Sequence, residues 1–273
     1  MDNRPIGVFD SGLGGLTAVS SLWRILPEED LIYFGDTARV PYGGRSPETI
    51  LKYARQDVRF LRSFDLKAIL IACGTVTTTS LTTLQAENDL PMVGVVEPTC
   101  QRAVLVTKNK RVGMIATAAS VRSGAYEATL RRLDPDVEVQ CLPCPLFVPL
   151  VENGHFAADN PVTRLVAQDY LREVKAAGVD TLILGCTHYP LLLEVIAQIM
   201  GPGVELVSAG EESAFQLKRL LKERDLRAPE NRQGETEFYV SDRVEDFEQT
   251  ASLFLQEDLR HAARRIDIDQ YGM

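Results

Sequence analysis

Residues 181–190 read TLILGCTHYP, a continuous apolar run that ends abruptly in a cysteine, a hydroxyl and a histidine. Pro190 then opens the next apolar stretch, and a proline suits the first turn of a helix. We therefore expect Cys186 at the carboxyl end of a buried strand, close to a helix N-terminus. Unpaired backbone N–H groups and the helix dipole favour anions there, and they can lower a cysteine pKa below its free value of about 8.5.

A second stretch repeats this pattern. Residues 68–75 read AILIACGT, so Cys73 is the counterpart of Cys186, 113 positions earlier (186 − 73). Likewise, the strand pattern around Gly7 returns around Gly113, 106 positions later (113 − 7). The similar offsets indicate an internal duplication of one βα domain. We expect two thiols that face one ligand from two similar halves.

Composition and charge narrow the class of protein. A chain of 273 residues forms one large or two ordinary domains. Its net charge of -9 argues against nucleic-acid binding, because phosphate contacts need clustered Lys and Arg. No apolar run approaches the roughly 20 residues that span a bilayer, and residues 1–5 precede a strand without the apolar core of a signal peptide. We expect a cytoplasmic protein with no nucleic-acid and no membrane partner.

Five cysteines, an odd number, favour reduced thiols over a disulfide framework. Cys141 and Cys144 form a lone CxxC, which fits a redox pair, half of a zinc site, or two ordinary buried cysteines. No second CxxC and no suitably spaced histidines complete a zinc site. We therefore favour two buried cysteines and expect no metal.

Two glycine-rich loops follow the first two strands. Residues 11–15 (SGLGG) either form a tight turn or cradle an anion, and the preceding Asp10 together with Ser11 favours a functional role. Residues 35–46 either connect elements or contact a ligand over the carboxyl edge of the sheet. Further along, Glu152 is either a solvated charge at a helix end or a carboxylate turned into the cleft.

The remaining pattern alternates strands and helices. We expect a strand at 92–96, a helix that begins near 77–80, and a final helix at 244–255. This predicts an α/β protein of two similar Rossmann-like βα domains, with the active site in the cleft between them. The first domain comprises residues 1–97 plus 209–273, because the C-terminal tail has no cysteine motif of its own, and the second comprises 98–208.

Two thiols flanking a cleft have three chemical uses. They form a disulfide redox couple if the sulfurs touch, or one is a nucleophile beside a histidine, as Cys186 is beside His188. The third use is inversion of a stereocentre, in which one base removes a proton from one face and one acid returns a proton to the other. This needs no metal or cofactor, although backbone donors would have to stabilise the carbanion-like state.

Several long motifs occur in order along the chain. They are residues 6–16 (IGVFDSGLGGL), 33–37 (YFGDT) with 41–43 (PYG), 97–98 (EP), 145–152 (PLFVPLVE) and 184–190 (LGCTHYP). These motifs resemble those of the bacterial glutamate racemases. The resemblance covers about residues 5–215 and implies two α/β domains, cofactor-independent interconversion of L- and D-glutamate, supply of D-glutamate for peptidoglycan, and a homodimer.

The resemblance also assigns roles to residues. Its catalytic cysteines fall on Cys73, which takes the proton from D-glutamate, and Cys186, which takes it from L-glutamate. Independently of the resemblance, we expect polar neighbours to assist these transfers, Asp10 and Ser11 in the first half and His188 with Glu152 in support in the second. The substrate contacts fall on Asp10, Ser11, Tyr42, Gly43, Gly74, Thr75, Thr187 and His188.

One position departs from the family's pattern. Where the family has Asn-Thr after the first cysteine, this chain has Gly74-Thr75. Glycine lacks the side-chain amide, and a lost hydrogen bond to a charged group costs about 1.5–3 kcal/mol. We expect weaker binding or altered substrate choice, and we expect Gly74→Asn to tighten glutamate binding.

Three alternatives therefore stay open. One is a racemase of the same superfamily that acts on aspartate or another amino acid. Another is a non-catalytic amino-acid-binding protein. The third is a thiol oxidoreductase with a Cys73–Cys186 disulfide.

Overall fold

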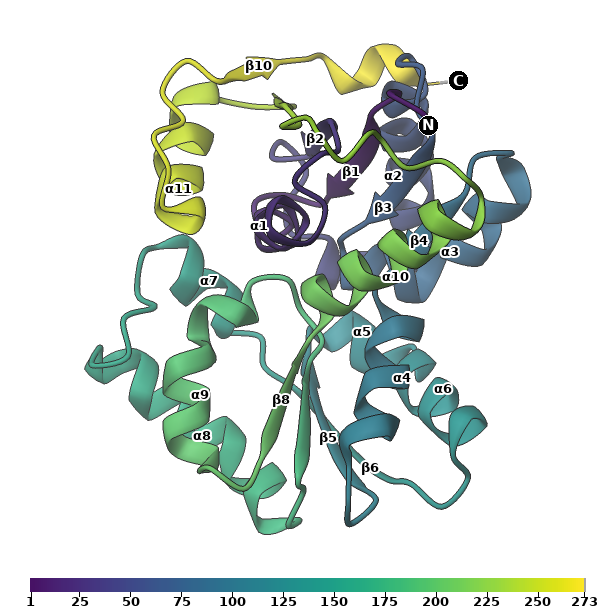
Figure 1. Cartoon of the computed structure of the whole chain (residues 1–273). Coiled ribbons are helices and arrows are strands. Elements are labelled where there is room, and N and C mark those ends of the chain that lie inside the picture. The colour runs from purple at the N-terminus through teal and green to yellow at the C-terminus, as the bar shows by residue number, and fades with distance from the viewer. Residues whose placement is uncertain (273) are drawn as a thin grey trace.

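The computed structural model describes residues 1–272, which form two parallel β-sheets flanked by helices (Figure 1). The first sheet has the strand order β10-β9-β2-β1-β3-β4 and the second has the order β6-β5-β7-β8. The predicted α/β class is thus confirmed. The strands are β1 (Ile6–Asp10), β2 (Leu31–Gly35), β3 (Ala68–Ile71), β4 (Met92–Gly94), β5 (Arg111–Ala116), β6 (Glu138–Pro143), β7 (Thr181–Leu184), β8 (Glu205–Ser208), β9 (Thr236–Val240) and β10 (Ala263–Arg265).

Helices cover both faces of each sheet. This explains why the central strands are continuous apolar runs, since a parallel sheet buried on both faces has no polar side. In β3, for example, Leu70 packs with the core on one face while Ile71 packs with the core on the other. The helices are α1 (Leu16–Ile25), α2 (Pro47–Leu61), α3 (Gly74–Glu87), α4 (Val96–Val106), α5 (Ala118–Arg122), α6 (Ala125–Leu133), α7 (Phe147–Glu152), α8 (Pro161–Ala176), α9 (Leu193–Met200), α10 (Ala209–Glu223) and α11 (Val244–Leu255), with 3₁₀ turns η1 (Tyr42–Gly44), η2 (Tyr189–Leu192) and η3 (Ile268–Tyr271).

The second sheet repeats the strand order of the first. Strands β2-β1-β3-β4 correspond in order to β6-β5-β7-β8, and Cys73 follows β3 as Cys186 follows β7. The chain then returns to the first half. Helix α10 packs against α1, and β9 pairs with β2 through the register Tyr33–Phe238. The C-terminal segment, coloured light green to yellow in Figure 1, thereby extends the first sheet.

Two expected boundaries need correction, and one strand was missed. The strand expected at 92–96 ends at Gly94, and Pro98 lies in the first turn of α4, where a proline is tolerated. Helix α3 begins at Gly74, immediately after Cys73, rather than near 77–80. Strand β10 was not predicted. Within residues 1–272, no helix has the length and apolar character that a membrane span requires.

Candidate active site

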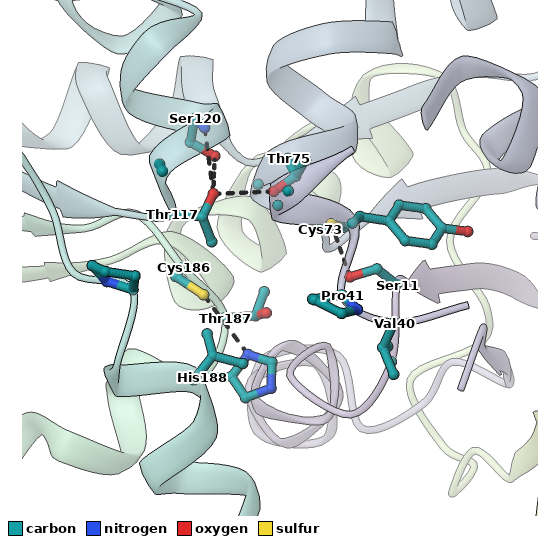
Figure 2. A pocket seen from close by; sticks show the side chains of 18 of the residues that line it. Ser11, Val40, Pro41, Cys73, Thr75, Thr117, Ser120, Cys186, Thr187 and His188 are labelled. Carbon is teal, nitrogen blue, oxygen red and sulfur yellow. Dashed lines mark hydrogen bonds between the residues drawn. The ribbon is translucent and has the colours of Figure 1, made fainter. Parts of the chain in front are cut away.

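A cavity of ≈ 440 Å³ lies between the two sheets, at the carboxyl ends of their central strands (Figure 2). Its wall includes Ser11 after β1, Cys73 after β3, Thr117 after β5 and Cys186 after β7. Ligands of parallel α/β sheets bind at such ends, where the strand order reverses. The volume suits a small molecule.

On one side of the cavity, Cys73 precedes the first turn of α3. Its sulfur lies 3.3 Å from the Ser11 hydroxyl oxygen. Burial raises the pKa of the Cys73 thiol to about 12, and the nearby Asp10 carboxylate raises it further than the Ser11 hydrogen bond lowers it. At Cys73, burial therefore raises the thiol pKa by more than the N-terminus of α3 lowers it. Cys73 is a protonated thiol at neutral pH.

On the other side, Cys186 begins a chain of polar groups. The Cys186 sulfur is 3.7 Å from Nδ1 of His188, and Nε2 of His188 is 3.1 Å from Oε1 of Glu152. Burial disfavours the imidazolium, but the interactions with Cys186 and Glu152 outweigh it and raise the pKa of His188 to about 10. A cation therefore lies beside Cys186. Glu152 lines the cavity and is the carboxylate turned into the cleft, not a solvated helix end.

The two sulfurs lie on opposite sides of the cavity, as Figure 2 shows. All five cysteines are free, so the structure forms no Cys73–Cys186 disulfide. Cys141 is half-buried, while Cys144 is buried and lines the cavity. Among residues 1–272, no three His, Cys, Asp or Glu side chains gather as a metal site would require.

Asp10 lies behind the cavity wall rather than in it. The carboxylate is 1% exposed, accepts a hydrogen bond from the Gly12 N–H at 2.9 Å and lies 3.5 Å from the Thr187 hydroxyl. Burial raises its pKa. Ser11, Gly12 and Thr187 line the cavity in front of it. This placement favours a role through these neighbours over the predicted direct contact with the substrate.

Tyr42 lines the cavity, but its hydroxyl is directed into the protein interior. The hydroxyl donates to Asp36 and lies 3.1 Å from Asp57 in the protein interior. The adjacent Gly43 approaches the other half, since a Cβ built there would lie 3.3 Å from Cβ of Thr117. The residues around Tyr42 therefore bridge the two halves of the cavity.

A family model described as Asp/Glu/Hydantoin racemase matches residues 17–214. The chain belongs to this racemase family. It is 46% identical over 252 residues to a glutamate racemase of Geobacter metallireducens, over 92% of this chain and 93% of that one. Among solved structures it resembles a glutamate racemase isoform of Bacillus anthracis, with a TM-score of 0.93 at 35% identity and 98% coverage of each chain. It also resembles the glutamate racemase of Francisella tularensis in complex with D-glutamate, with a TM-score of 0.90 at 39% identity, over 99% of this chain and 100% of that one.

Gly74 marks a close approach of the two halves of the racemase fold. A Cβ built on Gly74 would lie 2.7 Å from the carbonyl oxygen of Gly185, which is backbone and yields little. The expectation that Gly74→Asn tightens glutamate binding stays a prediction, and this close approach argues against it because an added Cβ would first have to displace backbone. A side chain at position 74 would require the backbone at Gly185 or at the start of α3 to shift.

Some cavity residues were not predicted. Thr117 bonds both Thr75 and Ser120 at 3.1 Å, and this group of hydroxyls lines one wall (Figure 2). The internal repeat could have predicted Thr117 as a cavity residue, because Thr117 follows β5 as Ser11 follows β1. Cys144 was singled out only for its CxxC spacing.

Proposed function

We propose that this protein is a glutamate racemase, which interconverts L- and D-glutamate with two cysteines and no cofactor and supplies D-glutamate for peptidoglycan synthesis. The observation that carries the proposal is the placement of Cys73 and Cys186 on opposite sides of one cavity (Figure 2). Inverting a stereocentre needs an acid and a base on opposite faces of the carbon, and this arrangement supplies both.

In the direction from L- to D-glutamate, the Cys186 thiolate removes the α-proton. The C–H bond breaks, an S–H bond forms, and the electron pair stays on the α-carbon and its carboxylate. The Cys73 thiol then gives its proton to the opposite face. Cys73, with its pKa raised to about 12, already holds that proton at neutral pH. Proton exchange with solvent resets the two sulfurs, and D-glutamate reacts by the reverse steps.

The neighbouring groups have distinct tasks. Protonated His188, held by Glu152, places a positive charge beside Cys186 and the developing negative charge. The first N–H groups of α3, at Gly74 and Thr75, are directed at the cavity end of the helix and suit a substrate carboxylate. Further substrate contacts in the proposal are Ser11, Tyr42, Gly43, Thr187 and His188, with Asp10 behind them.

Substrate choice has a second candidate. Gly74 lacks the side-chain amide usual in glutamate racemases, which favours testing aspartate as well. The test incubates each enantiomer of glutamate and aspartate with the purified protein in deuterated water, without added cofactor, and follows α-proton NMR and circular dichroism. Exchange and loss of optical activity with both glutamate enantiomers supports the proposal. The same result with aspartate alone would replace glutamate, and no exchange with any would favour a binding protein.

The domain division, location and oligomeric state belong to the same proposal. Sheet membership supports a first domain of residues 1–97 plus 209–273 and a second of 98–208, because β9 and β10 join the first sheet. The homodimer rests on the resemblance to the family, and the cytoplasmic location rests on the sequence, in which no apolar run is long enough to span a bilayer. Light scattering after size exclusion tests the dimer.

A further inference from the structure

Residues 40–44 form one wall of the cavity and contain only the short turn η1. Val40 and Pro41 lie beside Ser11 on the Cys73 side in Figure 2. Gly43 extends the wall toward Thr117 of the other half. A wall without a helix or strand of its own needs side-chain anchors to keep its place, and the buried side chain in this segment is that of Tyr42, which is 1% exposed.

The Tyr42 hydroxyl lies between two buried carboxylates. It bonds Oδ2 of Asp36, which follows β2, and lies 3.1 Å from Oδ2 of Asp57 on α2. Both carboxylate side chains are completely buried. The loop is thereby tied to the first sheet and to the helix that covers it.

One cation serves this cluster. Arg39 bonds Oδ2 of Asp36 at 2.6 Å through Nε and Oδ1 of Asp57 at 2.9 Å through Nη2. Its Nη1 donates to Oε1 of Gln56 at 2.6 Å, and the Ser241 hydroxyl donates to Oδ1 of Asp36 at 2.8 Å. With both carboxylates ionised, the buried cluster would carry a net negative charge, which is costly without a second cation.

The number of hydrogen atoms between Tyr42 and the two carboxyl groups also favours one protonated carboxyl group. A tyrosine hydroxyl has one hydrogen, so it donates to one carboxylate only. An ionised Asp57 would turn an oxygen lone pair toward the Tyr42 oxygen with no hydrogen between them. A protonated Asp57 instead donates to Tyr42, which donates to Asp36, while Oδ1 of Asp57 still accepts from Arg39.

We infer that Asp57 is a neutral carboxylic acid at working pH, and that Asp57, Asp36 and Arg39 act through Tyr42 as positioning residues for the substrate-binding wall. This rests on the proposed function, because it deepens the role of the same cavity. Burial and the neighbouring Asp36 raise the pKa of Asp57, in agreement with the hydrogen-bond geometry. Asp36 carries the charge that balances Arg39.

The first test compares the same chemical change at the two carboxylates. Asparagine at position 57 supplies an N–H toward Tyr42 and a C=O toward Arg39, so Asp57→Asn should keep the KM for glutamate within about twofold of wild type. Asp36→Asn removes the charge that balances Arg39 and should raise KM by about tenfold or more. Equal damage from both changes would overturn the neutral assignment of Asp57.

The second test isolates the Tyr42 hydroxyl. Tyr42→Phe should raise KM about tenfold and leave kcat within about twofold, because the wall bears neither thiol. The matched control is Tyr239→Phe, since the Tyr239 hydroxyl bonds Glu237 and Arg264 away from the cavity. A fall in kcat at unchanged KM, or equal effects from both variants, would exclude a positioning role.

A third readout does not depend on activity. The infrared difference spectrum between wild type and Asp57→Asn at neutral pH should contain the C=O band of a protonated carboxylic acid. Only ionised-carboxylate bands in that spectrum would overturn the inference. If the wild-type protein fails to racemise glutamate but shows the protonated band, the proposed function fails while the state of Asp57 stands.

Discussion

At the scale of single residues, the two thiols have different surroundings. Cys73 is buried beside Ser11 and keeps its proton until about pH 12, whereas Cys186 lies beside a protonated His188. The asymmetry gives each sulfur a starting role with L-glutamate, Cys186 as base and Cys73 as acid. The positive charge of His188 depends in turn on Glu152, which helps to raise the pKa of the imidazole.

Replacing either thiol should separate proton exchange from racemisation. Cys73→Ser and Cys186→Ser should each cut racemisation by about 10²–10⁴-fold, because one of the two proton transfers is lost. Cys73→Ser should still exchange the α-proton of L-glutamate with solvent, and Cys186→Ser that of D-glutamate. NMR in deuterated water measures both, with Cys141→Ser as the control. Near wild-type racemisation by either cavity variant would exclude the two-base account.

The His188–Glu152 pair predicts a pH dependence. The pKa of His188 is raised to about 10, so its charge is present below that pH and lost as the pH rises through it. The profile of kcat/KM should therefore fall above about pH 10. Glu152→Gln removes an interaction that favours the imidazolium, so the fall should move to lower pH. The exposed Glu194→Gln is the control, and an unmoved profile in Glu152→Gln would contradict the assignment.

At this scale the structure places both thiols, His188 and Ser11 on the cavity wall, where the sequence predicts them, because reactive side chains directly after apolar runs lie at the carboxyl ends of strands. The sequence did not predict the side-chain directions of Asp10 and Tyr42. Asp10 ends β1 and its carboxylate turns behind the wall, while Tyr42 lies in the loop after β2 and its hydroxyl turns into the interior. Side-chain direction within a loop depends on tertiary packing, which periodicity does not encode.

At the scale of elements, the start of α3 sets how closely the two halves approach. Gly74 begins the helix and faces the Gly185 carbonyl after β7, so any Cβ there presses on backbone. Most element positions followed from apolar patterning and turn residues. The exceptions were short or ambiguous segments, such as the charged three-residue β10 and Pro98 inside the first turn of α4.

Substituting Gly74 should therefore weaken catalysis. Gly74→Ala and Gly74→Asn should raise KM and lower kcat/KM by about tenfold, in line with the roughly 1–3 kcal/mol cost of overpacking. Gly203→Ala is the matched control, because nothing lies within 4 Å of a Cβ built at that position. Steady-state kinetics and calorimetric binding of D-glutamate measure the effect. Tighter binding by Gly74→Asn would show that the halves yield easily and that the missing amide matters more.

At the scale of the whole molecule, two similar halves contribute one thiol each to a shared cavity. The repeated strand order was predictable from the matching cysteine motifs. That the chain returns to complete the first sheet was inferred only from the lack of a third cysteine motif. The structure adds the physical reason, since β9 covers the edge of β2 and carries Phe238 and Val240 into the core.

Ending the chain after Gly234 should abolish folding as well as activity. The removed segment buries several large apolar side chains, each worth about 1.5–3 kcal/mol, against a total stability of about 5–15 kcal/mol. Thermal unfolding followed by circular dichroism should lose its cooperative transition. A folded, active truncated protein would contradict this role of the segment. The apolar side chains in question are Phe238, Tyr239, Val240, Phe247, Phe254 and Leu255.

The most direct test of the central claim is where deuterium first appears. L-Glutamate is incubated with the protein in deuterated water to low conversion, the enantiomers are separated, and α-deuterium is measured in each by mass spectrometry. Two opposed thiols predict that the D-glutamate formed carries deuterium from the Cys73 side, while recovered L-glutamate keeps its α-proton. When D-glutamate is the starting enantiomer, the L-glutamate formed should carry deuterium and the recovered D-glutamate should keep its α-proton. Transfer of the original proton to the product enantiomer would show that one base serves both faces, and would contradict the assignment of Cys73 and Cys186 as an acid–base pair.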